Sequence, residues 1–216
     1  MVKIKNTGSL IIVSGPSGAG KGTICANLLK SNPNIKCSVS MTTRLPRGNE
    51  VDGVDYYFVD QEKFEEEINK NNFLEYAKVH GNYYGTPKDK VCELLSNGYD
   101  VILEIDIQGA LEIKEKYTDG IFIFIMPPSM KELKERLVKR NTESLDKIIE
   151  RFKNAYKEIN EITKYNYVVV NDEVELATKK VESIIIAEKC RVDRIEEFDL
   201  NNQEEILHEL LVDFNK

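Results

Sequence analysis

The stretch GPSGAGKGT at residues 15–23 decides the fold. An apolar run at residues 10–13 comes directly before it and predicts a buried strand, while residues 23–29 carry apolar side chains at helical spacing. The stretch therefore joins a strand to a helix. Its glycines let backbone N–H groups turn inward without a Cβ clash, and the N-terminus of the following helix carries partial positive charge. Such a turn is suited to binding a phosphate group.

Lys21 and Gly22 refine this interpretation. The stretch has the spacing of a phosphate-binding loop, in which the lysine reaches the β- and γ-phosphates of a nucleotide. In the usual pattern Ser or Thr follows the lysine and its hydroxyl binds Mg²⁺. Gly22 takes that position here and Thr23 follows. We therefore expect no metal site made by the protein alone, with Mg²⁺ held mostly by nucleotide phosphates and water.

The composition of the 216-residue chain is that of a globular protein, with 41% hydrophobic residues and a net charge of −7. The negative charge argues against general nucleic-acid binding. The four cysteines form no C-x-x-C pair, so we expect reduced cysteines in a cytoplasmic protein. No apolar run reaches membrane-spanning length and no signal-peptide core is present, so we expect no membrane partner.

Strand-like apolar runs recur along the chain at residues 10–13, 101–105, 121–126 and 167–170. Helical segments separate most of them, and this alternation predicts an α/β fold with a parallel sheet covered by helices. Residues 35–86 contain short strand-like pieces instead, which predict an inserted β-rich subdomain. Ser129 and Glu132 have the spacing of a capping box and predict a helix that runs to about residue 140, with a second helix from about residue 144.

The last residues, 191–216, are acidic and carry an apolar stripe at helical spacing, made by Ile206, Leu207, Leu210 and Leu211. They predict a short terminal helix that packs on the rest of the protein or on a second copy of the chain. A homo-oligomer is therefore one of the states we expect.

Glu104 and Asp106 follow the apolar strand that begins at Val101, and alternation along a strand places both carboxylates on the same side. Beside a phosphate loop, such carboxylates can orient the water shell of a metal ion. The alternative is that they meet solvent or cap a turn. Asp106 and Gly109 also have the D-x-x-G spacing of GTPase switches. That interpretation requires a later N-K-x-D segment, and Asn171-Asp172 without a lysine stands there instead.

Arg44 and Arg47 lie three residues apart on a turn, and two guanidinium groups in this arrangement can clamp a phosphate. Tyr56 and Tyr84 offer hydroxyl donors for the same site, and Glu50 can pair with and orient an arginine. The alternative is a solvated basic turn.

Six stretches of the chain, in this order, resemble the guanylate kinase family over about residues 8–188: SGPSGAGKGT, SVSMTTRLPRGNEVDGVDYYF, FLEYAKVHGNYYGTP, LEIDIQGA, PPSMKELKERLVKRNTES and VVVND. The resemblance implies the phosphate-loop three-layer fold, with a core, a GMP-binding insertion at about 35–86 and a helical lid at about 127–160. It also implies the reaction Mg-ATP + GMP ⇌ ADP + GDP, which belongs to purine nucleotide metabolism.

The resemblance also implies roles for individual residues. The implied ATP-binding residues are Gly15, Pro16, Ser17, Gly18, Ala19, Gly20, Lys21, Gly22 and Thr23, with Asn171 near the adenine. The implied GMP-binding residues are Ser40, Arg44, Arg47, Glu50, Tyr56, Glu75, Tyr84, Thr86, Glu104 and Asp106. The implied catalytic residues, which surround the transferring phosphoryl group, are Lys21, Arg136, Arg140 and Arg151.

The chemistry of guanine supports the base-binding residues independently. Guanine presents N1–H and an exocyclic amine side by side, and one carboxylate, Glu75, can accept both hydrogen bonds. The hydroxyls of Ser40 and Thr86 can donate to O6. Adenine brings an acceptor to the same place, so the carboxylate disfavours it.

Two other functions use parts of the same pattern. A scaffold domain can bind phosphopeptides through the arginine pair, but it does not need the intact loop at residues 15–23. A kinase for another monophosphate would share the loop, but it would not need Glu75 with two hydroxyl partners. Coupled ADP production from ATP and a panel of monophosphates separates the three.

Overall fold

The computed structural model describes residues 2–4, 7–79, 81–139, 145–198, 208 and 211. A central sheet has the strand order β10-β9-β2-β8-β3, and all neighbouring strands in it are parallel. This confirms the α/β fold. Its strands are β2 (Leu10–Ser14), β3 (Ile35–Cys37), β8 (Asp100–Glu104), β9 (Ile121–Met126) and β10 (Tyr167–Val170).

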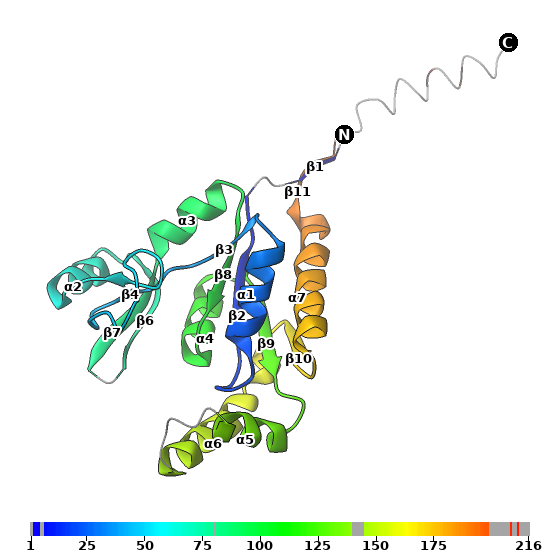
Figure 1. Cartoon of the computed structure of the whole chain (residues 1–216). Helices are drawn as coiled ribbons and strands as arrows, with labels where there is room; N and C mark the ends of the chain where they lie inside the picture. Colours follow the sequence, from blue (N-terminus) through cyan, green and yellow to red (C-terminus); the bar gives the residue numbers. More distant parts are fainter. Residues whose placement is uncertain are drawn as a thin grey trace.

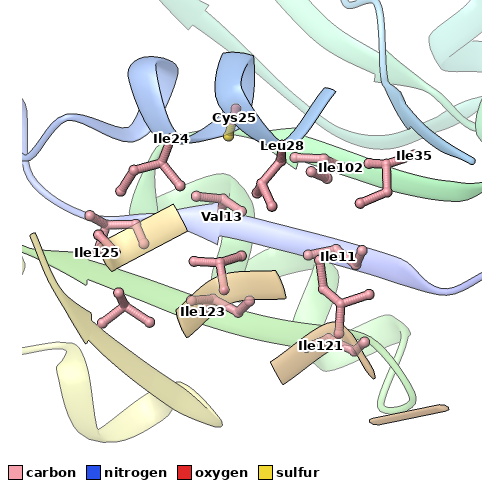
Figure 2. Packing of buried hydrophobic residues seen from close by; sticks show 14 of the residues in the cluster. Ile11, Val13, Ile24, Cys25, Leu28, Ile35, Ile102, Ile121, Ile123 and Ile125 are labelled. Carbon is pink, nitrogen blue, oxygen red and sulfur yellow. The ribbon is translucent and has the colours of Figure 1, made fainter. Parts of the chain in front are cut away.

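Helices cover both faces of this sheet, so the middle strands are apolar throughout rather than alternating. In β2, Ile11 and Val13 face α1 and α7, whereas Ile12 belongs to the cluster on the other face, beneath α3 and α4. Figure 2 shows Ile24 and Leu28 of α1 pointing toward β2. The four helices are α1 (Lys21–Ser31), α3 (Lys88–Ser96), α4 (Ile107–Lys116) and α7 (Val174–Lys189).

The expected insertion forms a separate sheet to one side of the core, with strand order β5-β4-β7-β6 (Figure 1). Phe64 of its helix is fully buried and stacks on Phe73 and Tyr83, with ring centroids 4.5 and 5.1 Å away. Residues 35–37 belong to the central sheet, as β3, so the separate sheet begins at residue 41. The elements are β4 (Met41–Thr42), β5 (Tyr57–Phe58), α2 (Gln61–Asn69), β6 (Phe73–Val79) and β7 (Asn82–Pro87).

The two helices expected after residue 127 are α5 (Met130–Lys139) and α6 (Leu145–Ile159), which pack together at the carboxyl end of the central strands (Figure 1). The Glu132 N–H donates to the Ser129 Oγ at 3.1 Å, which is the capping bond that the sequence predicts. Leu133 and Leu137 are buried, and a Cβ placed on Gly18 would lie 3.0 and 3.2 Å from them. The lid therefore packs directly on the loop at residues 15–23.

A small antiparallel pair is formed by β1 (Val2–Ile4), near the start of the chain, and β11 (Ile195–Phe198). Two short 3₁₀ helices complete the described elements, η1 (Ile162–Lys164) and η2 (Val192–Arg194). Among the described helices, none is long and apolar enough to cross a membrane. In the predicted terminal helix, only His208 and Leu211 are described; both are helical, and the Leu211 side chain is 58% exposed. Ile206, Leu207 and Leu210, which complete its apolar stripe, lie outside the described residues.

The stacked rings of the insertion give a first prediction. We expect Phe64→Ala to lower the free energy of unfolding of the insertion by about 3–5 kcal/mol, because it removes a fully buried aromatic side chain. Hydrogen exchange of the amides in β6 and β7, compared with those in β2 and β9, measures this loss locally. Val54→Ala, at a side chain that is 68% exposed, is the control. Unchanged protection in β6 and β7 would contradict the prediction.

Candidate active site

The loop at residues 15–23 follows β2 and begins α1, and it can form only with glycine at two positions. Gly15 has φ +140° and Gly20 has φ +93°, both in the region that side chains rarely adopt. A Cβ on Gly15 would lie 2.1 Å from the Ile125 carbonyl oxygen, and one on Gly20 would lie 2.3 Å from the Asn171 Nδ2. The loop is thus enclosed by β9 on one side and by the residue after β10 on the other.

Lys21 is folded back onto this loop. Its Nζ donates to the carbonyl oxygens of Gly15 at 2.6 Å and Pro16 at 3.3 Å. Burial lowers the pKa of Lys21, and Glu104 and Glu158 oppose that effect. The ammonium group therefore lies among carboxylates and loop carbonyls, at the place where a charge can meet a phosphate chain.

Asn171 shapes the loop, which differs from its expected place near the adenine. Its side chain is 1% exposed, and its Nδ2 donates to the Ala19 carbonyl oxygen at 2.7 Å. The backbone carbonyl oxygen of Asn171 accepts a hydrogen bond from the Arg136 side chain at 3.0 Å. A side chain that is buried against the loop backbone braces that backbone, and it is not exposed to a base.

The helices α5 and α6 place one of the three expected arginines, Arg151, on the loop, and a second, Arg136, on the neighbouring residue Asn171. Arg136 on α5 bonds to Glu132 at 2.6 Å as well as to the Asn171 carbonyl. Arg151 on α6 donates to the Ser17 hydroxyl, and Glu158 on the same helix interacts electrostatically with Lys21. Arg140 lies outside the described residues.

The predicted phosphate clamp is built around Glu50. Its two carboxylate oxygens each accept from Arg44 at 2.9 Å, and one also accepts from the Arg47 N–H at 2.7 Å. These contacts raise the pKa of Arg44 and lower that of Glu50. Arg44 also lies over the rings of Tyr56 and Phe58, 5.3 and 5.7 Å from their centroids. The arginine is therefore held in one orientation, as the sequence predicts for Glu50.

The Tyr84 ring lies edge-on to Tyr56, with the ring centroids 6.1 Å apart, and the Tyr84 hydroxyl contributes to the raised pKa of Arg44. The Arg47 side chain is exposed. Arg44, Glu50, Tyr56 and Tyr84 thus form one cluster in the insertion, where β4 lies between β5 and β7.

Glu75 on β6 and Thr86 on β7 form a pair, because antiparallel strands bring them together. The Thr86 hydroxyl donates to the Glu75 Oε1 at 2.6 Å. Burial raises the pKa of Glu75, and the bond from Thr86 opposes the rise. A hydroxyl has a single proton, so Thr86 cannot donate to guanine O6 while it donates to Glu75. This differs from the expected role of Thr86: it orients the carboxylate.

A cavity of about 160 Å³ lies between the insertion and the carboxyl ends of the central strands. It brings together Ser40, Tyr56, Thr86 and Glu104 from the predicted site, and it is also lined by Cys37, Ser38, Asp55, Leu103 and Ile105. A larger cavity of about 480 Å³, beside η2 and the start of β2, contains none of the predicted site residues.

Ser38 is a cavity residue that the sequence analysis missed. Its Oγ is buried, and it has no hydrogen-bond partner within the part of the chain that the structure describes. The signal was its spacing of two from Ser40, which places both hydroxyls on one side of an extended segment.

Glu104 and Asp106 have separate surroundings. Glu104 lines the cavity, and its carboxylate oxygens lie 3.4 Å from the position of a Cβ on Gly22. Burial raises the pKa of Glu104, and Lys21 opposes the rise. Asp106 caps α4, since its Oδ1 accepts from the Gly109 N–H at 2.8 Å. Asp106 thus has the capping role that was the alternative in the sequence analysis.

Comparison with known proteins agrees with this arrangement. The guanylate kinase family model matches residues 7–188. Guanylate kinase of Clostridium tetani is 62% identical over 206 residues, which is 95% of this chain and 99% of that protein. Guanylate kinase of Clostridium perfringens is 60% identical and covers 96% of each chain.

The crystal structure of guanylate kinase from Anaplasma phagocytophilum superimposes with a TM-score of 0.71 at 35% identity, covering 89% of this chain and 92% of that one. Sequence, fold and site geometry agree, and the chain belongs to the guanylate kinase family.

Proposed function

We propose that this chain transfers the γ-phosphoryl group of Mg-ATP to GMP, giving ADP and GDP. The observation that carries the proposal is the position of Glu104. It lines the cavity that contains Ser40, Tyr56 and Thr86, and it interacts electrostatically with Lys21 of the phosphate loop. The acceptor site and the donor site therefore adjoin, as direct transfer between two nucleotides requires.

On the ATP side, the backbone N–H groups at residues 15–23 bind the phosphates. Lys21 exchanges its bonds to the Gly15 and Pro16 carbonyls for bonds to phosphate oxygens. Arg151 bonds to Ser17 of the loop and Arg136 to the adjacent Asn171 backbone, and both neutralise the charge of the transferring group. Arg140 is assigned the same role from the resemblance alone.

On the GMP side, Arg44 and Arg47 bind the phosphate, with Tyr56 and Tyr84 as further donors and Glu50 holding Arg44 in place. Glu75 accepts from guanine N1–H and the exocyclic amine. Because the Thr86 proton is used by Glu75, Ser40 is the predicted residue that donates to O6.

Mg²⁺ is the cofactor that this reaction needs, and when bound with ATP it neutralises charge on the phosphates. Within the described residues, no three His, Cys, Asp or Glu side chains lie close enough to hold a metal ion. The Glu104 carboxylate beside Gly22 fits an ion that is bound mainly by phosphates and water. Glu104 is the residue that would orient that water, since Asp106 caps α4.

The reaction needs no proton-abstracting residue, because phosphoryl transfer proceeds mainly by positioning and charge neutralisation. A GMP phosphate oxygen attacks the γ-phosphorus in line, while the loop and the clamp hold the two nucleotides. We place the reaction in the cytoplasm and treat a homo-oligomer as an expected state, both from the sequence.

Base selection gives the second prediction. We expect wild type to prefer GMP over AMP by at least about 10³ in kcat/KM, because a site built to accept two donors rejects a base that lacks them. We expect Glu75→Gln to lose most of its GMP activity and to bind an ATP analogue as wild type does, since the new NH₂ group confronts a guanine donor. Steady-state kinetics with both monophosphates and calorimetry with the ATP analogue measure these effects.

Glu115→Gln is the matched control for that variant, because Glu115 is exposed on α4. Equal use of AMP and GMP by wild type would overturn the assignment of guanine. Full GMP activity in Glu75→Gln would show that the base is bound by other residues.

The clamp gives the third prediction. Glu50→Gln removes one of the two charge-assisted bonds that orient Arg44, and such bonds contribute about 1.5–3 kcal/mol. We expect the KM for GMP to rise by about tenfold or more, with little change in the KM for ATP. Glu62→Gln, at an exposed position on α2 of the same insertion, is the control. An unchanged KM for GMP would show that Arg44 does not need Glu50.

A further inference from the structure

We propose that Gly109 is a positioning residue for base selection, because its missing side chain lets the Glu75 carboxylate lie against the first turn of α4. The inference rests on the proposed function of Glu75. According to this proposal, a glycine in the core helps to select the base that the insertion binds.

The close approach is visible in the distances. A Cβ built on Gly109 would lie 3.0 Å from the Glu75 Oε2, 3.2 Å from its Cγ and 3.3 Å from its Cδ. Contacts this short are tighter than almost all real Cβ contacts, so a methyl group there requires that Glu75 move. Gly109 is itself buried, because α4 packs against β6.

Glu75 has little freedom to give way. Its other oxygen, Oε1, accepts the bond of 2.6 Å from Thr86, and Thr86 is fully buried. The carboxylate is therefore held between two fixed points, the hydroxyl of the insertion on one oxygen and the backbone of α4 beside the other. Guanine differs from adenine and from hypoxanthine in the donors that it presents to such a carboxylate, so the position of both oxygens decides which base is bound.

The backbone gives no other reason for a glycine at this position. Gly109 lies inside α4, and its φ is not in the left-handed region that glycine alone tolerates well. Alanine is the better helix former, so the helix by itself would favour a side chain here. The contact with Glu75 is the feature of its surroundings that excludes one.

The end of α4 opposes part of the rise in the pKa of Glu75 that burial causes. Gly109 lies in the first turn of α4, where the partial positive charge of the helix N-terminus attracts an anion. Asp106, which caps that helix, and Glu112 act in the opposite direction and raise the pKa of Glu75, as burial does. A methyl group at residue 109 would displace the carboxylate from the helix end and leave these unfavourable effects in place.

Gly109→Ala tests the proposal because it should change the KM for GMP and leave the KM for ATP unchanged. We expect the KM for GMP to rise by about tenfold, since one hydrogen bond to a charged group is weakened, while the KM for ATP stays as in wild type. We also expect the preference for GMP over inosine monophosphate to fall, because that analogue lacks the exocyclic amine. We expect the thermal midpoint to fall slightly, because the gain in helix propensity is opposed by the strain of moving Glu75. Gln108→Ala, at the exposed neighbouring position of α4, is the control.

A double-mutant cycle separates positioning from a general effect on the fold. If Gly109 acts through Glu75, Gly109→Ala added to Glu75→Gln weakens GMP binding, measured by calorimetry, by much less than it does in wild type. An unchanged KM for GMP and an unchanged preference over inosine monophosphate in Gly109→Ala would overturn the proposal, as would additive effects in the cycle. Wild-type kinetics alone test the proposed function, because a wild type that does not prefer GMP overturns the role of Glu75 itself.

Discussion

The turn between β2 and α1 has to close in a space that admits no side chain at Gly15 or Gly20. The Ile125 carbonyl of β9 and the Asn171 amide after β10 occupy that space. The loop is therefore shaped by two neighbouring strands of the parallel sheet, and the sheet in turn is held by buried residues such as Ile11 and Ile123. Two charged groups contact this turn directly: Lys21 lies on its carbonyls, and Arg151 of α6 donates to Ser17. Arg136 of α5 bonds instead to the backbone of Asn171, whose side chain contacts the turn.

The acceptor site depends on a different kind of constraint. In the insertion, Glu50 fixes Arg44 and Thr86 fixes Glu75, so two of the groups proposed to bind GMP are already held by a partner residue. Pre-oriented groups lose less conformational freedom on binding than mobile ones. The core and the insertion come together at two residues of the core. Glu104 lines the cavity between them, and Gly109 lies against Glu75 of the insertion.

The sequence predicted the α/β fold, the phosphate loop and the pairing of Glu50 with an arginine because each depends on residues that lie near one another in the chain. The capping bond between Ser129 and Glu132 was also predictable, because it joins residues only three positions apart. The sequence did not predict that Asn171 braces Ala19 or that Thr86 donates to Glu75, because those contacts join residues that only the folded sheet brings together. The place of β3 in the central sheet was missed for a related reason: the sequence of a short strand does not indicate which sheet it joins.

The contact between Gly18 and α5 joins the packing of one helix pair to the shape of the phosphate loop. Leu133 and Leu137 are buried between α5 and α6, and they also form the surface on which the loop rests. A substitution that repacks these helices therefore changes the wall of the phosphate loop, even when it leaves the stability of the protein intact. The two leucines are at once core residues of the helix pair and part of the surroundings of the loop.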